Sequence, residues 1–280
     1  MQAKVDTNYL KIVIAAIIWG SSGAFVKYLG LPAPLISFFR LGLPTLFLGI
    51  YFLARRQPVF RNNMRLLLIA SVINAVRLLF YFIGFLNAPI GNAIMILYTW
   101  PVFAVIFSHI FLKEPLPGLN KLLLVVALAG IVLIYSDKPV GLDNDVFWGM
   151  SAMLLSALLY SSTVIIFKKE SLKYDHLQIV FFQNLVGAVL FLPFFVLGFD
   201  ALTLHKASVA SLYAFAVGIV GFGLFFFSLR RIPASNASFL AYIEVPSAVL
   251  FGVFLFHETL TWNEIVGGVM IIGASVMLKK

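Results

Sequence analysis

The chain has 280 residues, of which 62% are hydrophobic and 11% are charged, whereas about a quarter of the residues of a soluble domain carry a charge. Water cannot cover so much apolar surface, so the composition excludes a soluble globular protein and indicates one embedded in lipid. The chain contains no cysteine, which excludes disulfides and cysteine-based metal or redox chemistry.

Apolar segments of about twenty residues follow one another along the chain, which is the length an α-helix needs to cross the hydrocarbon core. Because these segments are continuously apolar rather than alternating, they predict helices and not the strands of a membrane barrel. The predicted spans, in chain order, are 9–28, 34–53, 65–86, 89–112, 119–136, 146–167, 177–198, 208–229, 232–256 and 260–278. The connections between them are too short to hold a soluble domain.

The net charge is +9. The positions of the basic residues predict the topology, because the cytoplasmic loops of membrane proteins are enriched in Lys and Arg. If the N-terminus is cytoplasmic, the cytoplasmic segments hold most of the basic residues, namely Lys4, Lys11, Arg55, Arg56, Arg61, Arg65, Lys113, Lys121, Lys168, Lys169, Lys173, Arg230, Arg231, Lys279 and Lys280. The opposite side holds only Lys27, Lys138 and Lys206. We therefore expect a multi-pass inner-membrane protein with both termini in the cytoplasm and no nucleic-acid partner.

The two halves of the chain resemble each other at an offset of 144 positions. The identical pairs include Pro89 and Pro233, Asn92 and Asn236, Tyr98 and Tyr242, and Glu114 and Glu258. With five spans in each half, 1–140 and 141–280, the second half must enter the membrane from the opposite side, as the loop charges also require. The sequence thus predicts an all-α integral membrane fold of ten transmembrane helices, built as two inverted five-helix repeats around a midplane site.

Several motifs connect this pattern to a known family. They are Trp19-Gly20 in the first span, Pro-Ala-Ser-Asn-Ala-Ser at 233–238, Glu244-Val-Pro246, Glu258-Thr-Leu, and the glycines at 267, 268 and 273. With these residues the chain resembles the drug/metabolite transporter superfamily, specifically its EamA-like branch of ten-helix carriers. The resemblance implies a central cavity lined by spans 1, 3, 4, 6, 8 and 9, with spans 5 and 10 as supports. This chain has Tyr160 where the family often repeats a Trp.

Charged residues near the middle of predicted spans are the first site candidates, because a charge there costs roughly 2.5–3.5 kcal/mol on insertion scales. Glu244 either faces a substrate amine or a coupling proton, or pairs with Arg77 or Arg40. Arg77 either clamps a substrate carboxylate through its planar fork of donors or neutralises Glu244. Arg40 lies nearer the outer end of its span, and we expect its side chain to extend to the interface.

Aromatic residues at similar levels form a second group of candidates. Trp100 is symmetric to Glu244, and an aromatic wall around it would hold apolar or cationic groups. The other candidate wall residues are Tyr98, Tyr242, Tyr81, Trp19 and Tyr160. The alternative is ordinary packing, since the chain has 29 Phe. Trp100, Tyr98 and Tyr242 are the strongest candidates because of their midplane level and symmetry.

Two Asn and two Pro residues occupy positions where they can affect the ends, the contacts or the bending of the predicted helices. Asn92 and Asn236 lie one turn inside their spans and either cap or cross-link helices, the interpretation we favour, or contact substrate. Pro101 and Pro246 lack a backbone donor within a span, and predict either a gating hinge or a static kink.

The motifs that are missing narrow the function further. No G-x-x-x-x-G-K-[ST] loop is present, so we expect no ATP-driven step and no cofactor. The histidines at 109, 176, 205 and 257 are scattered, which argues against a metal site and an enzyme. We expect a secondary transporter of small organic solutes, chiefly amino acids or related metabolites, working by export or exchange with protons as a candidate coupling ion. The alternatives are a carrier of cationic, aromatic or nucleotide-like compounds, or a membrane-embedded enzyme or sensor. We expect a monomer or weak homodimer.

Overall fold

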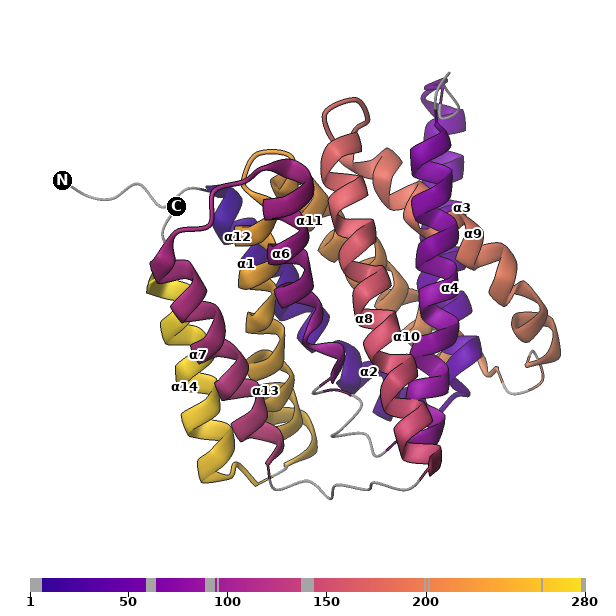
Figure 1. The fold of residues 1–280 in the computed structure, drawn as a ribbon. Coiled ribbons are helices and arrows are strands. Elements are labelled where there is room, and N and C mark those ends of the chain that lie inside the picture. The colour runs from indigo at the N-terminus through magenta and orange to yellow at the C-terminus, as the bar shows by residue number, and fades with distance from the viewer. Residues whose placement is uncertain are drawn as a thin grey trace.

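The computed structural model describes residues 7–58, 64–88, 94, 96–136, 144–198, 200, 202–257 and 259–277, and all regular structure in these ranges is helical (Figure 1). The first half contains α1 (Thr7–Gly20), α2 (Ser22–Leu29), α3 (Ala33–Ala54), α4 (Arg65–Asn87), α6 (Trp100–Leu112) and α7 (Gly118–Tyr135). The second half contains α8 (Asn144–Glu170), α9 (His176–Leu197), α10 (Leu204–Tyr213), the π-helix η2 (Ala214–Gly221), α11 (Phe222–Leu229), α12 (Ala234–Leu240), the 3₁₀ turn η3 (Ala241–Ile243), α13 (Glu244–Phe256) and α14 (Trp262–Met277).

Eight stretches of described helix are long and apolar enough to cross a membrane. Two further apolar helices, α6 and α14, are shorter. These stretches show a multi-pass membrane protein, and each predicted span overlaps one of the eight stretches or one of the two shorter helices. The prediction of ten complete crossings stays a prediction, because α6 and α14 fall below the length of the others.

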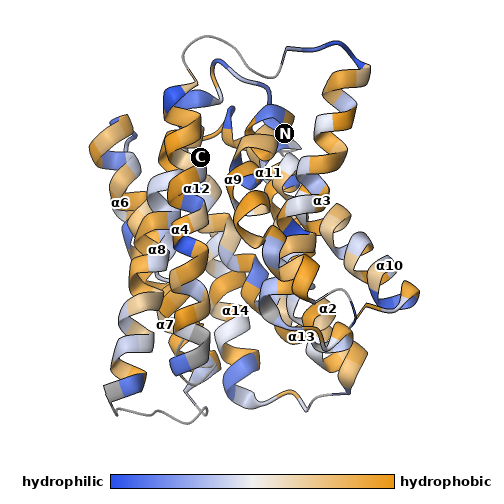
Figure 2. Ribbon diagram, turned by 90° about the vertical axis from the view of Figure 1, so that its right-hand side faces the viewer, coloured by the Kyte–Doolittle hydropathy of each residue, from blue (hydrophilic) through white to orange (hydrophobic). Residues whose placement is uncertain are grey.

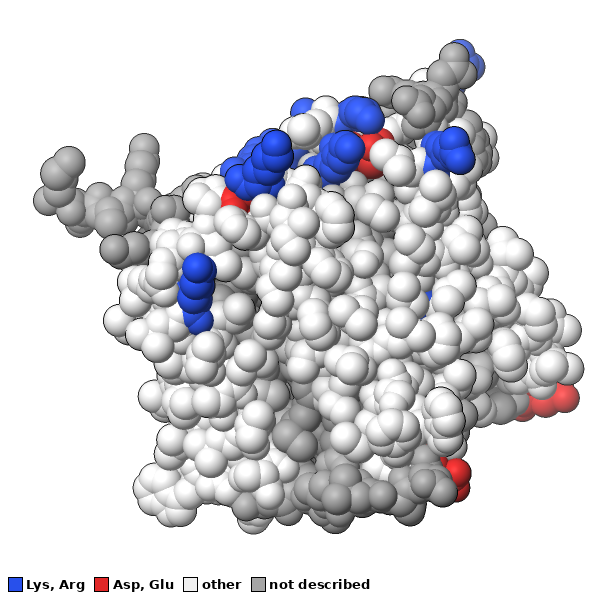
Figure 3. All heavy atoms as spheres, viewed as in Figure 1, with Lys and Arg blue, Asp and Glu red and all other residues white. Residues whose placement is uncertain are grey.

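The outer surface explains why lipid is the solvent. Large apolar side chains such as those of Leu53, Val196 and Val276 are exposed, and Figure 2 shows hydrophobic residues along the middle of most helices. Lys and Arg gather along the upper edge of the molecule in Figure 3, where α3, α6, α8 and α11 end. We call this edge the basic end. The expected asymmetry of basic charge is therefore present across the described residues.

Helices from the two halves pack against each other in pairs. At one side of the molecule, α7 packs along α14 (Figure 1). A Cβ on Gly130 would lie 2.7 Å from the carbonyl oxygen of Gly267, so the absence of side chains allows these two backbones to touch. At the other side, α4 packs along α8 and α3 along α9. The pair α7 and α14 is thus peripheral, as expected for spans 5 and 10.

The two halves share helix boundaries. Both α6 and α13 have 13 residues, and their first residues, Trp100 and Glu244, are symmetric in the sequence repeat. Each helix ends at a left-handed residue, Lys113 with φ 55° and His257 with φ 53°. In Figure 1 the connection from α6 to α7 lies at the top and the connection from α13 to α14 at the bottom. The helices α6 and α13 therefore point in opposite directions.

Candidate functional site

The helices that carry the main candidates are interrupted directly before them. Tyr98 and Thr99 form a turn before Trp100, and η3 precedes Glu244. The amide of Glu244 donates to the carbonyls of Ala241 and Tyr242 rather than to a residue one α-helical turn back. The backbone nevertheless stays in the right-handed helical region at Thr99 and Ile243, so each interruption is a tightened turn, which often marks a functional hinge or a strained sequence. The two tightened turns occupy equivalent positions of the sequence repeat, directly before α6 and α13.

A third interruption approaches Glu244 from α1. A turn at Ser21 separates α1 from α2, and Gly20 at the end of α1 packs against the start of α13. A Cβ on Gly20 would lie 2.9 Å from the carbonyl oxygen of Glu244 and 3.0 Å from the amide nitrogen of Ala248. Only a glycine allows this approach. The Trp19-Gly20 motif therefore has a packing role beside Glu244 that sequence patterns did not predict.

Glu244 is partly exposed and lies among polar groups from several helices. The Tyr98 hydroxyl donates a hydrogen bond to its carboxylate, and an electrostatic interaction connects it to Arg40 on α3. The ion pairs of the described residues involve Lys173 with Glu170 and His176 with Asp175, so Glu244 has no direct ion pair there. The cation that influences Glu244 is Arg40, whereas the interactions of Arg77 involve other groups.

Arg40 does not extend to the interface as expected. Its guanidinium carbon lies 5.5 Å from the ring centroid of Phe222, and it interacts electrostatically with Arg77, Tyr81 and Glu244. Its position depends on a close helix contact, because a Cβ on Gly218 of η2 would lie 3.0 Å from the Arg40 carbonyl oxygen. Pro44 leaves that carbonyl without its usual helical donor. Arg40 therefore interacts with polar groups inside the protein rather than with the membrane interface.

Arg77 on α4 is buried, with 6% of its surface exposed. Its Nε donates to Asn74 Oδ1 at 3.2 Å, and the Asn74 amide donates to the carbonyl of Gln183 on α9 at 2.9 Å. Its guanidinium carbon lies 4.4 Å from the ring centroid of Tyr160. Asn74 and Gln183 fix one edge of the guanidinium and Tyr160 covers a face. Neither Asn74 nor Gln183 was singled out from the sequence, since Asn and Gln in apolar spans are as often structural as functional.

Tyr160, Trp100 and Tyr81 complete the cluster. The rings of Trp100 and Tyr160 meet edge to face at 4.7 Å, and the Ser161 hydroxyl of α8 donates to the Trp100 carbonyl at 2.7 Å. Tyr81 interacts electrostatically with Arg40, Arg77 and Glu244. We refer to Arg40, Arg77, Glu244, Tyr81, Tyr98, Trp100 and Tyr160 as the central polar cluster. Its members come from α3, α4, α6, α8, α13 and the turn before α6.

The ring and hydrogen-bond partners of three predicted candidates lie outside this cluster. Trp19 packs on Phe222 and Phe225 of α11 with ring centroids 4.8 and 5.1 Å away, and its indole nitrogen is buried without a partner among the described residues. Tyr242 is completely buried, and its ring contacts Phe239. The Asn236 amide donates to the Tyr9 hydroxyl at 2.9 Å. These positions favour packing for Trp19 and Tyr242, and a cross-link from α12 to α1 for Asn236.

The remaining candidates concern the interrupted helices. Asn92 lies outside the described residues. Pro101 is the second residue of α6 and Pro246 the third of α13, so each stands in the first turn after an interruption. Proline is well accommodated there because first-turn amides have no helical acceptor. Each proline therefore lies within three residues of a tightened helical turn, and a gating hinge or a static kink at these positions stays a prediction.

Contacts between the halves also form at the basic end. The Glu114 carboxylate accepts hydrogen bonds from the amides of Ala234 and Ser235 at 2.9 and 3.2 Å, which caps the start of α12. Within the second half, the Lys168 ammonium of α8 donates to the carbonyls of Leu229 and Ile232, the latter at 2.7 Å. Since Glu114 follows α6 and α12 belongs to the second half, this cap joins the two halves at the basic end.

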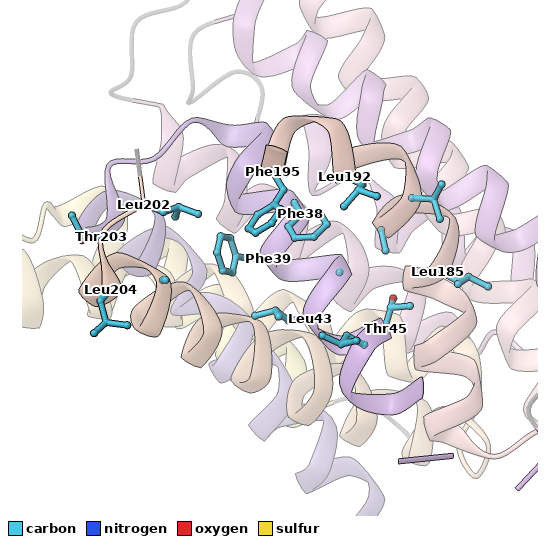
Figure 4. Close-up of a pocket in the computed structure, with 15 residues that line it drawn as sticks. Phe38, Phe39, Leu43, Thr45, Leu185, Leu192, Phe195, Leu202, Thr203 and Leu204 are labelled. Carbon is cyan, nitrogen blue, oxygen red and sulfur yellow. The ribbon is translucent and has the colours of Figure 1, made fainter. Parts of the chain in front are cut away.

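An apolar groove of about 770 Å³ lies between α3, α9 and the start of α10 (Figure 4). Phe38 of α3 and Phe195 of α9 stack there with ring centroids 4.5 Å apart. Apart from Thr45 and Thr203, the side chains that line it are apolar. No member of the central polar cluster lines this groove, so we assign the candidate site to the cluster instead.

Comparison with known proteins identifies the family. The pattern of the EamA-like transporter family matches residues 7–136 and again residues 147–279. This chain belongs to the EamA-like transporter family. The resemblance to the drug/metabolite transporter superfamily is thereby confirmed, and the protein is a transporter of that superfamily.

Individual relatives of this EamA-like transporter span nearly its whole length. The uncharacterized transporter YoaV of Bacillus subtilis is 26% identical over 275 residues, covering 94% of this chain and 93% of YoaV. The pseudopaline exporter CntI of Pseudomonas aeruginosa is 28% identical over 285 residues, covering 99% and 97%. Mouse solute carrier family 35 member G1 is 23% identical over 278 residues, covering 93% and 74%.

A solved structure described as a crystal structure of a protein has the same fold. It superposes with a TM-score of 0.84 at 17% identity, and the match covers 96% of this chain and 95% of that chain. At this identity the likeness concerns the fold alone. The relatives and the family pattern supply the function class, while the central polar cluster supplies the chemistry from which a substrate is inferred.

Proposed function

We propose that this protein is a secondary transporter that exports or exchanges small amphoteric solutes, such as amino acids or related metabolites, across the inner membrane by alternating access. The single observation that carries the proposal is the central polar cluster. Carboxylate and guanidinium groups stand there inside apolar helices without a direct ion pair to each other among the described residues. Charges inside a membrane are costly, and they mark substrate or ion pathways.

We further propose that ten spans form two inverted five-helix repeats with both termini in the cytoplasm. The shared boundaries of α6 and α13, their opposite directions, and the family pattern that matches each half support this arrangement. The basic end would then be cytoplasmic, following the positive-inside rule. Two such bundles rock around a site at their interface in transporters of this architecture.

The chemistry of the cluster supports an amphoteric solute. Glu244 offers a carboxylate to an amine, and Arg77 offers donors to a carboxylate. The rings of Tyr160 and Trp100 provide apolar walls beside Arg77. Export as the direction is supported by the relative CntI, which is named as an exporter. A carrier of cationic or aromatic compounds is the second candidate, because Tyr81, Tyr98 and Tyr160 each interact electrostatically with Glu244.

Counterflow in proteoliposomes tests the proposal. Vesicles containing the purified protein are loaded with an unlabelled solute, and uptake of the labelled solute is followed for a panel of amino acids, organic amines and nucleosides. Repeating the assay with an imposed proton gradient tests proton coupling. We expect exchange of at least one amino acid, whereas exchange limited to amines or nucleosides would contradict the proposal.

Substitutions then test the assignment of the site. Glu244→Gln and Arg77→Gln keep approximate side-chain size and remove one charge each, so each should reduce exchange of the transported solute at least tenfold. Asp145→Asn and Arg65→Gln are matched controls, since both residues are exposed at helix starts. Unchanged exchange in both site variants would reject the assignment.

A further inference from the structure

The central polar cluster has unequal numbers of positive and negative groups. Arg40, Arg77 and Glu244 are the charged residues that lie well inside the described helices, since the others stand near helix ends. The neighbouring titratable groups are tyrosines, namely Tyr81, Tyr98, Tyr135, Tyr160 and Tyr213. With Glu244 ionised, the cluster contains two guanidinium groups and one carboxylate, which leaves one positive charge uncompensated.

The electrostatic and hydrogen-bond partners of the two guanidinium groups differ. Arg40 interacts electrostatically with Glu244, and its charge is therefore the one that Glu244 offsets. Arg77 shows no such interaction with Glu244, and the nearby positive charge of Arg40 opposes it. The Nε of Arg77 is held by Asn74, an uncharged partner. Arg77 is thus the cation without a compensating anion among the described residues.

Arg77 is also arranged to receive an anion. Its Nε edge is fixed by Asn74 and a face is covered by Tyr160. The two terminal nitrogens have no hydrogen-bond partner in the described part of the chain, yet they are not among the fully enclosed unpaired atoms. Two parallel donors at a fixed guanidinium match the two oxygens of a carboxylate. A buried cation without an anion is costly, so a bound carboxylate would stabilise it.

We infer, on the basis of the proposed function, that the transported solute is an amphoteric metabolite with one more carboxylate than amine, and hence a net negative charge. One carboxylate binds the terminal nitrogens of Arg77. The amine lies at Glu244, and the second carboxylate lies near Arg40. The loaded site is then electrically neutral, which is the state that favours movement through an apolar protein interior.

Binding of four probes of similar size tests this charge rule. L-glutamate carries two carboxylates and one amine, L-glutamine one of each, L-ornithine an additional amine, and glutarate two carboxylates without an amine. Each is titrated against the purified protein while thermal stability is measured, since a ligand of the folded state stabilises it by mass action. We expect L-glutamate to bind roughly tenfold or more tightly than each of the other three.

Variants show whether Arg77 is responsible. Arg77→Gln should abolish the preference for L-glutamate over L-glutamine, Arg77→Lys should retain part of it, and Arg65→Gln on the same helix should leave it unchanged. Retention of the charge preference in Arg77→Gln overturns the role of Arg77. If Arg77→Gln does not fold, Arg77→Lys decides, because a preference undiminished without the planar fork also overturns that role.

The two proposals fail in different ways. The inference is overturned if L-glutamine, L-ornithine or glutarate binds as tightly as L-glutamate, or if none of the four stabilises the protein. The proposed function is overturned by the counterflow panel, when no amino acid exchanges. A neutral amino acid that exchanges well would therefore remove the charge rule and leave the transport function in place.

Discussion

The contact between Gly20 and the start of α13 gives the sharpest structural prediction. In Gly20→Ala, the new Cβ would lie 2.7 Å from the Cβ of Ser247, 2.9 Å from the carbonyl oxygen of Glu244 and 3.0 Å from the amide nitrogen of Ala248. Two of these atoms belong to the backbone, so α1 and α13 must separate. Overpacking of this kind costs about 1–3 kcal/mol, which exceeds the gain of up to about 1 kcal/mol that alanine brings to a helix interior.

Gly23→Ala is the matched control, because nothing lies within 4 Å of a Cβ there. It should leave stability unchanged or raise it by up to about 1 kcal/mol. Denaturation of both variants in detergent micelles measures the difference, and counterflow shows whether the shift of α13 disturbs the site at Glu244. If Gly20→Ala were as stable and as active as Gly23→Ala, the close approach of α1 to Glu244 would be incorrect.

Three further predictions concern the basic end and the topology. Lys168→Met should destabilise the protein by about 1–3 kcal/mol, because the carbonyls of Leu229 and Ile232 lose their donor. The control Lys169→Met changes an exposed neighbour and should leave stability unchanged. Equal denaturation midpoints for the two variants would contradict the role of Lys168. Glu114→Ala removes the acceptor for the amides of Ala234 and Ser235 and should lower the free energy of unfolding by about 0.5–2 kcal/mol. Because the chain lacks cysteine, the thiol of Ser235→Cys reports how accessible the start of α12 is. It should react faster with maleimide when combined with Glu114→Ala than in Ser235→Cys alone. The cysteines of Lys173→Cys and Asp145→Cys should react with an impermeant maleimide from the cytoplasmic and outer sides respectively. Labelling of both from one side would refute the crossing of α8 on which the inverted arrangement depends.

Arg40 illustrates why part of the site could not be predicted. Its distance from the span end suggested that it reaches the interface, but in the structure it interacts with Glu244 and Arg77. Which way such a side chain turns depends on the packing of η2 against α3 through Gly218. That contact joins residues far apart in the sequence, and no local pattern records it.

For Tyr242 and Trp19 the sequence suggested a place in the site, whereas the structure packs both side chains among other residues. Symmetry with Tyr98 suggested that Tyr242 lines the site, yet Tyr242 is completely buried beside Phe239, while Tyr98 reaches Glu244. A sequence repeat gives equivalent helix positions, but the side chains that surround them differ between the halves. Trp19 packs on Phe222 and Phe225, since an aromatic residue in an apolar span fits a core as well as a cavity.

The sequence by itself determined that the protein lies in lipid, that its spans are helical, that its basic charge is asymmetric and that it belongs to a transporter family. These properties depend on composition, on the length of apolar runs and on motifs. It also identified Glu244, Arg77 and Trp100 as unusual, since charge and symmetry are visible along the chain. Only the tertiary structure decided that Arg40 interacts with Glu244, and that Arg77 instead contacts Asn74 and Tyr160. The physical reason is that a span surrounded by lipid is apolar on every face, so its sequence does not mark which face meets another helix.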